Sequence, residues 1–90
     1  MKVEFDRSFE KSLQKVGDSS ILSRIRKIVT RCESAKSLAD IPNIKKLTGF
    51  RNYYRIRSGE YRIGLELMNA NTIRFIIIMH RKDIYRNFPK

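Results

Sequence analysis

The spacing of apolar residues changes once along this chain, from a helical period to the alternation of strands. Up to about residue 35 apolar positions recur every three or four residues, and from residue 52 they alternate with polar ones. The first spacing places side chains on one face of a helix, and the second places them on one face of a strand. The pattern predicts an α+β fold in which helices precede most of a sheet.

The N-terminal part predicts a short strand followed by a hairpin of two helices. The stretch KVEF (Lys2–Phe5) is typical of a strand, and Asp6 is a candidate N-cap for a first helix that Gly17 ends. Asp18 or Ser19 is expected to cap the second helix. Its apolar stripe, which assigns the single cysteine to the core, consists of Ile21, Leu22, Ile25, Ile28, Val29 and Cys32.

Three alternating segments, 52–57, 60–68 and 71–80, predict an antiparallel three-stranded meander with the helices packed on one face. The connection 36–52 is compatible with one short extended segment. A two-residue turn at Ser58-Gly59 would place Arg55 opposite Arg62, about 5 Å apart. Such a pair is repulsive unless an anion such as phosphate lies between the guanidinium groups.

The same register predicts one apolar face and one open, basic face for the first two strands of the meander. The basic face holds Tyr53, Arg55, Arg57, Arg62, Gly64 and Glu66. In the third strand, simple alternation groups Phe75 with Ile77 and Met79, and groups Ile78 and His80 with Arg74 and Ile76. Apolar residues on both sides favour a central strand that ends near the basic face. The tail after residue 86 is expected to be loosely held.

Charge indicates a polyanionic partner. The 90 residues, which we expect to form one domain (1–90), carry a formal charge of +11. Residues 1–44 contain nine Lys or Arg against six Asp or Glu, and residues 45–90 contain eleven against three. Because the surplus follows strand sequence rather than a long amphipathic helix, it favours nucleic acid over a membrane. An acidic protein is also compatible, and the helical stripe Arg24, Lys27 and Arg31 is expected to be a solvated face.

The remaining composition narrows the classes of function. A single cysteine excludes an internal disulfide, and one Cys with one His makes a zinc site improbable. No stretch resembles a signal peptide or approaches the roughly 20 apolar residues of a membrane span, so we expect a cytoplasmic protein. The chain also lacks the G-x-S-x-G and P-loop motifs.

Two stretches, KKLTGFRNYYRIRSGEYRIGLEL (45–67) and FIIIMHRKDIYR (75–86), resemble the RelE/ParE superfamily of type II toxins, particularly its RelE branch. The resemblance implies a small α+β domain of the RelE-like microbial RNase fold. It also implies an endoribonuclease that cuts messenger RNA in the ribosomal A site, without metal or other cofactor, by attack of the RNA's 2′-hydroxyl. The implied partners are the ribosome, mRNA and an acidic antitoxin that forms a hetero-oligomer with the toxin.

The family motifs carry over position by position. Arg55 and Arg57 match paired cations, but where arginine replaces a family lysine the role of base does not transfer, since arginine keeps its proton. His80 then becomes the best acid or base, and Glu66 a weaker one. The implied catalytic set is Arg55, Arg62, His80, Arg81 and Tyr85. The implied RNA-binding set is Lys45, Lys46, Tyr53, Arg57 and Lys82.

Two other functions stay open on the sequence. ParE-type members share the fold but poison DNA gyrase without nuclease activity, and that branch tends to lack the Arg, His and Tyr cluster. A homologue without activity that serves with its antitoxin as a repressor is a third possibility. Tyr85 is equally compatible with packing its ring against the sheet.

Overall fold

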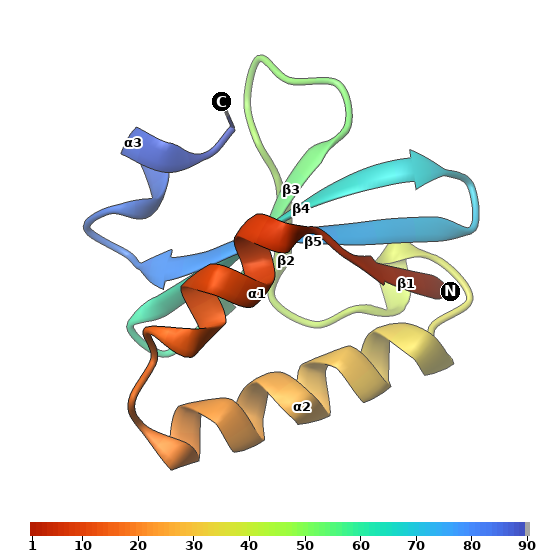
Figure 1. The fold of residues 1–90 in the computed structure, drawn as a ribbon. Helices are drawn as coiled ribbons and strands as arrows, with labels where there is room; N and C mark the ends of the chain where they lie inside the picture. Colours follow the sequence, from red (N-terminus) through yellow and green to blue (C-terminus); the bar gives the residue numbers. More distant parts are fainter. Residues whose placement is uncertain (90) are drawn as a thin grey trace.

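The computed structural model describes residues 1–89 and is built around one five-stranded sheet (Figure 1). The strands are β1 (Lys2–Phe5), β2 (Ile44–Lys46), β3 (Tyr53–Ser58), β4 (Tyr61–Asn69) and β5 (Thr72–His80). They lie in the order β1-β5-β4-β3-β2, with β1 parallel to β5 and the other pairs antiparallel. The predicted meander is β3-β4-β5, the extended segment of the connection is β2, and β5 is a central strand as expected.

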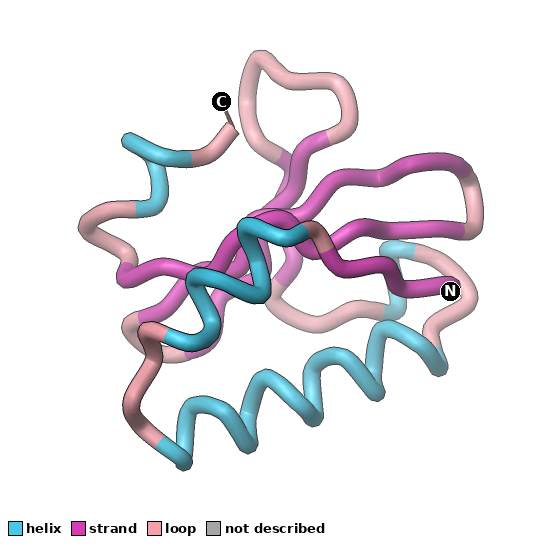
Figure 2. Tube along the Cα trace, in the orientation of Figure 1, coloured by secondary structure: helices cyan, strands magenta, loops and turns pink. Residues whose placement is uncertain are grey.

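Helices α1 (Arg7–Gln14) and α2 (Ser19–Ser34) pack on the same face of the sheet (Figure 2). The Asp6 carboxylate accepts a hydrogen bond from the Ser8 amide at 3.0 Å, and Asp18 accepts one from Ser20 at 2.8 Å. Asp18 is therefore the second cap, and the first helix ends at Gln14, before Gly17. The α+β fold is confirmed. No helix within residues 1–89 combines the length and the apolar content that crossing a bilayer requires.

The main core lies between these two helices and the sheet, as the apolar stripes predict. Its fully or nearly fully buried side chains include Phe9, Ile25, Cys32, Ile56, Ile63, Leu65, Ile73, Phe75 and Ile78. Burial raises the pKa of the Cys32 thiol to about 11, so the thiol stays protonated at neutral pH. Its assignment to the core is confirmed.

The predicted alternation along β5 is wrong at one position, because the pairing with β4 shifts there. Gly64 pairs with Ile77, but the next residue of β4, Leu65, pairs with Phe75, which leaves Ile76 as an extra residue. Such a bulge reverses the faces of the residues on either side of it. Phe75 thus packs against Phe9 with ring centroids 5.4 Å apart, whereas Ile77 faces away from α1 and α2.

As far as residue 89, the C-terminal tail is not loosely held, contrary to expectation. A short helix, α3 (Ile84–Asn87), follows β5 on the sheet face opposite α1 and α2, and Phe88 after it is only 3% exposed. Phe88 packs with Leu47 and Ile77 in a second, smaller cluster. This cluster anchors α3, and with it Tyr85, on the open face of the sheet.

A candidate phosphate-binding site

The turn between β3 and β4 lies one residue later than predicted. Its two central residues are Gly59 and Glu60, and the φ of +58° at Gly59 is accessible to glycine without steric cost. Arg62 therefore pairs with Arg57, and the predicted pairing with Arg55 is wrong. Moving the turn by one residue changes each partner by two positions, so every side chain keeps its face. The predicted grouping of these side chains on one basic face is confirmed, but the face is open only in part, because Phe88 covers it at Gly64.

Four arginines from the strands and from the end of β5 gather on this face. We call Arg55, Arg57, Arg62 and Arg81 the arginine cluster. Partial burial lowers the pKa of Arg62, and the positive charges of Arg55, Arg57 and Arg81 add to the effect, while Tyr85 acts in the opposite direction. The side chains of the cluster therefore lie near enough to Arg62 for their charges to repel one another. An oxyanion bound among them would relieve that repulsion.

The backbone of the turn fixes the central guanidinium. Nη1 of Arg62 donates to the carbonyl oxygens of Gly59 at 2.7 Å and Tyr61 at 3.0 Å. Within residues 1–89, no carboxylate lies within 4.0 Å of the guanidinium groups of Arg55, Arg57 or Arg62. Guanidinium presents a rigid, planar fork of donors that matches phosphate. The arrangement suits one phosphate group held from several directions.

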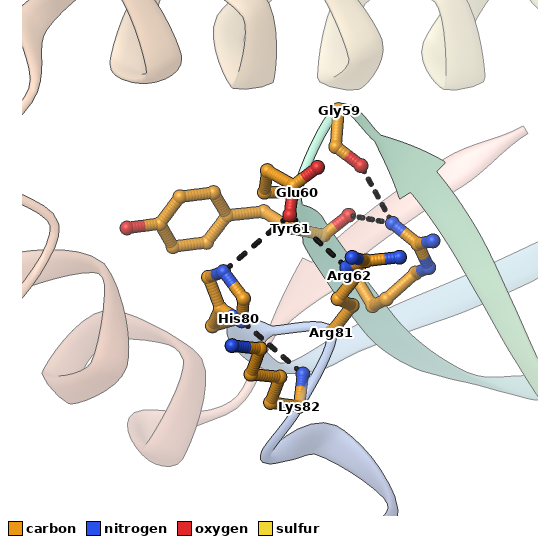
Figure 3. A network of polar contacts seen from close by, with 7 residues as sticks. All are labelled: Gly59, Glu60, Tyr61, Arg62, His80, Arg81 and Lys82. Atoms are coloured by element: carbon orange, nitrogen blue, oxygen red, sulfur yellow. Dashed lines mark hydrogen bonds and ion pairs between the residues drawn. The ribbon is translucent and has the colours of Figure 1, made fainter.

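Arg81, by contrast, belongs to a small network at the hairpin turn (Figure 3). Its Nε lies 3.0 Å from Oε2 of Glu60, and the same carboxylate oxygen lies 3.6 Å from Nε2 of His80. The backbone amide of Lys82 donates to Nδ1 of His80 at 3.2 Å. An accepting Nδ1 places the imidazole proton of the neutral ring on Nε2, toward Glu60.

His80 lies on the opposite side of the sheet from Arg62. His80 pairs with Tyr61 across the two strands, and their ring centroids are 5.9 Å apart (Figure 3). Arg62 is the next residue after Tyr61 in β4, so its side chain points to the opposite side of the sheet. The bulge at Ile76 accounts for the position of His80, because beyond it Ile78 and His80 lie on the helix side that Phe75 occupies before it. The imidazole therefore reaches the arginine cluster only around the strand end, through Glu60 and Arg81.

A pocket of about 370 Å³ adjoins the arginine cluster on the side of α3. We call it the Tyr85 pocket, and Arg55, Lys45, Lys46, Phe50 and Tyr85 line it over a floor that includes Phe88. Tyr85 is 61% exposed and Phe50 is 45% exposed. The alternative in which Tyr85 packs against the sheet is therefore wrong, and its ring is available to a ligand.

Two residues of the predicted RNA-binding set do not join the cluster or this pocket. The Tyr53 ring is held between Phe50 and Phe88, with centroids 5.9 and 5.3 Å apart, and it lines a separate hollow beside Glu66. Lys82 is exposed and lies on the His80 side of the network. Phe50, which the sequence patterns do not single out, lines the Tyr85 pocket instead.

The sequence patterns also do not predict that Glu60 pairs with side chains at the end of β5, or that two cations of α2 lie beside the arginine cluster. Arg24 and Lys27 line a groove with Arg57, Arg62 and Arg81, although their stripe predicts a solvated face. A turn at Ser58-Gly59 would place Glu60 opposite Arg57, so it does not predict the pairs that Glu60 forms with His80 and Arg81. The signal for Arg24 and Lys27 was their spacing of three residues, which puts both on one side of a helix.

Comparison with known proteins identifies the class to which this fold and site belong. The family described as "ParE toxin of type II toxin-antitoxin system, parDE" matches residues 3–85. The chain therefore belongs to the RelE/ParE superfamily of type II toxins. More particularly, it is a RelE-like toxin: Toxin RelE3 of Methanocaldococcus jannaschii is 48% identical over 90 residues, which cover 99% of this chain and 100% of that protein.

Solved structures agree with this assignment. The RelB-RelE antitoxin-toxin complex from Methanococcus jannaschii contains a chain that is 44% identical, with a TM-score of 0.79 over 96% of this chain and 99% of that one. The toxin-antitoxin complex RelBE2 from Mycobacterium tuberculosis matches at 21% identity, with a TM-score of 0.70 over 89% and 96% of the two chains. The second match supports the fold alone.

Proposed function

We propose that this toxin is a ribosome-dependent endoribonuclease that cleaves mRNA in the A site and works in the cytoplasm. The observation that carries the proposal is the arginine cluster, which lies beside the exposed Tyr85 ring. Among residues 1–89, no carboxylate lies within 4.0 Å of its Arg55, Arg57 or Arg62 guanidinium groups. A phosphate fits the cluster, and an unstacked base fits the neighbouring pocket. The charge of +11 favours docking to ribosomal RNA.

The proposed chemistry uses the substrate's own nucleophile. The 2′-oxygen attacks the adjacent phosphorus, the bond to the 5′-oxygen breaks, and a 2′,3′-cyclic phosphate and a 5′-hydroxyl end remain. The crowded phosphate gains negative charge that Arg62 and its neighbours are fixed to stabilise. Tyr85 orients the substrate by stacking on a base, and Lys45 and Lys46 contact the strand beyond it.

His80 is the candidate for moving a proton at this site. Arginine keeps its proton at neutral pH, so another group must take the proton of the 2′-hydroxyl or give one to the 5′-oxygen. The Nε2 proton of His80 points to Glu60, which also holds Arg81. We infer that His80 acts from the rim of the cluster when the substrate engages Arg81.

Replacing His80 by glutamine is expected to lower the single-turnover cleavage rate on programmed ribosomes by about 100-fold or more, the usual range for a general acid or base. The half-exposed position predicts an unchanged Tm. The matched control is Glu60→Gln, which removes the carboxylate partner but not the imidazole, and should lose less than about tenfold. Near-normal cleavage by His80→Gln removes His80 from the mechanism.

The partner of this toxin is proposed to be an acidic antitoxin made with it, in a hetero-oligomer. The relatives from Methanococcus jannaschii and Mycobacterium tuberculosis are toxin-antitoxin complexes. The basic face is the surface that an acidic segment complements best.

The match to a family described as ParE toxin keeps gyrase poisoning as the second candidate. One experiment separates the two. The protein is induced in cells, mRNA 5′ ends are mapped, and plasmid supercoiling is followed in the same culture. Codon-phased cuts in translated regions with normal supercoiling are expected. Intact mRNA with blocked supercoiling contradicts the nuclease and supports the gyrase poison.

A further inference from the structure

A second basic hollow lies on the other side of the arginine cluster from the Tyr85 pocket. This α2 groove has a volume of about 710 Å³ and runs between α2 and the hairpin turn of β3 and β4. Its charged lining consists of Arg24, Lys27, Arg57, Glu60, Arg62 and Arg81. The charged lining therefore contains five positive side chains and one negative one, the Glu60 carboxylate, which already pairs with Arg81.

The α2 side of the groove is positioned by both the helix and the turn. Arg24 and Lys27 are three residues apart, so they project from one side of α2. Arg24 extends over the turn, because a Cβ placed on Gly59 would lie 3.0 Å from its Nη1. Within residues 1–89, neither Arg24 nor Lys27 has a carboxylate within 4.0 Å. Both charges border the groove, and within the described part of the chain neither forms an ion pair, although Arg24 interacts electrostatically with Asp18, the N-cap of α2.

The groove and the arginine cluster are continuous, since Arg57, Arg62 and Arg81 belong to both. RNA carries one phosphate per nucleotide, so a strand that holds one phosphate at Arg62 must place its neighbours on either side. On one side lies the Tyr85 pocket, with its aromatic rings. On the other lies a groove that no aromatic ring lines and whose charged residues are five cations and Glu60. This asymmetry suits a base on one side and backbone on the other.

We propose that the α2 groove is a second phosphate-binding site, in which Arg24 and Lys27 bind the backbone phosphate next to the one held at Arg62. The inference rests on the proposed RNA-cleaving function and extends it to the path of the strand. The phosphate belongs to the single strand that is cleaved. A ribosomal RNA phosphate has the same chemistry, and the experiment separates these two sources.

The test compares two double variants that remove the same charge from the same helix. Arg24→Gln/Lys27→Gln changes the groove, and Arg26→Gln/Arg31→Gln changes α2 residues that do not line it. The probe is a labelled 2′-O-methyl RNA hexamer, which lacks the nucleophile and cannot be cut. Its affinity is measured by fluorescence anisotropy at several salt concentrations within the range over which counterion release is usually followed, roughly 50 to 200 mM, after equal Tm values establish that both variants fold.

The groove variant is expected to bind about five- to tenfold more weakly at the lowest salt concentration. Its slope of log affinity against log salt should be smaller by about 0.7, the contribution of one phosphate of a single strand. The control variant should keep the slope of the unchanged protein. These results support the proposal even if the protein proves not to cut mRNA, because the probe reports binding alone.

Equal slopes for the two double variants overturn the proposal, and so does an unchanged protein that fails to bind the hexamer. If the groove variant loses affinity for ribosomes but not for the hexamer, the groove binds ribosomal RNA. The proposal that it binds the strand to be cleaved is then overturned. The proposed nuclease fails separately, when the unchanged protein leaves mRNA uncut on programmed ribosomes.

Discussion

Replacing Arg62 by glutamine is expected to lower mRNA cleavage on programmed ribosomes by about 10²- to 10³-fold, which is the usual cost of losing one preorganised donor to a developing oxyanion. Arg62 is central to the arginine cluster, since the other three arginines all lie near enough to affect its pKa. Its hydrogen bonds to the Gly59 and Tyr61 carbonyl groups fix the guanidinium before substrate arrives. The measurement is the single-turnover rate at saturating toxin.

Two further variants test whether the reduced cleavage rate is caused by loss of the guanidinium group at position 62. Arg62→Lys keeps the charge but not the planar fork, so it should recover only part of the rate. Arg74→Gln removes an arginine from the same sheet, where it pairs with Glu4 at 3.0 Å, and should leave cleavage nearly unchanged. A normal rate in Arg62→Gln would contradict the phosphate site. Equal losses in the Arg62 and Arg74 variants would reduce the effect to net charge.

The sequence predicts the basic face correctly even though it misplaces the turn. An error of one residue at Ser58-Gly59 shifts every partner by two, and a shift of two leaves side chains on the same face. The faces were therefore recoverable from periodicity, while the identity of each cross-strand pair was not. The position of the turn depends on which residue takes a positive φ, and Gly59 does so as the first central residue.

Features that depend on contacts between distant parts of the chain could not be predicted from the local spacing of apolar and polar residues. The bulge at Ile76 is set by packing against both faces of β5, and strict alternation places Phe75 and Ile77 together. The same alternation put His80 with Arg74, whereas the structure pairs it with Tyr61 on the helix side. Tyr85 follows the end of β5 closely in the sequence, but its place in the pocket beside the arginine cluster could not be predicted, because it depends on how the tail folds back onto the sheet.

Replacing Gly64 by alanine is expected to displace α3 and to reduce cleavage by about tenfold or more, although the residue lies outside the arginine cluster. An added Cβ would lie 2.6 to 2.7 Å from three ring atoms of Phe88, closer than packed carbon atoms approach. The Phe88 ring must then move, and with it the short helix that carries Tyr85. Misplacing a substrate-positioning group by about 1 Å can cost 10²-fold in rate.

The same substitution should destabilise the fold by about 1–3 kcal/mol, as overpacking usually does. The corresponding fall in Tm is roughly 4–8 °C for each kcal/mol in a domain of this size. Gly17→Ala is the matched control, because nothing lies within 4 Å of the added Cβ and its φ is not positive. It should change stability by no more than about 0.5 kcal/mol and leave cleavage normal.

A double-mutant cycle with Phe88→Leu tests whether the two residues act through direct contact. The smaller, flexible leucine can yield to the methyl group that the Gly64→Ala change adds, so Phe88→Leu should cost less in the Gly64→Ala protein than in the unchanged one. We expect a coupling energy of at least about 0.5 kcal/mol, measured by thermal or urea unfolding. Strictly additive costs would mean that Phe88 does not press on Gly64. The main core on the opposite face has no part in this contact, so each variant should keep the fold on which the cleavage assay depends.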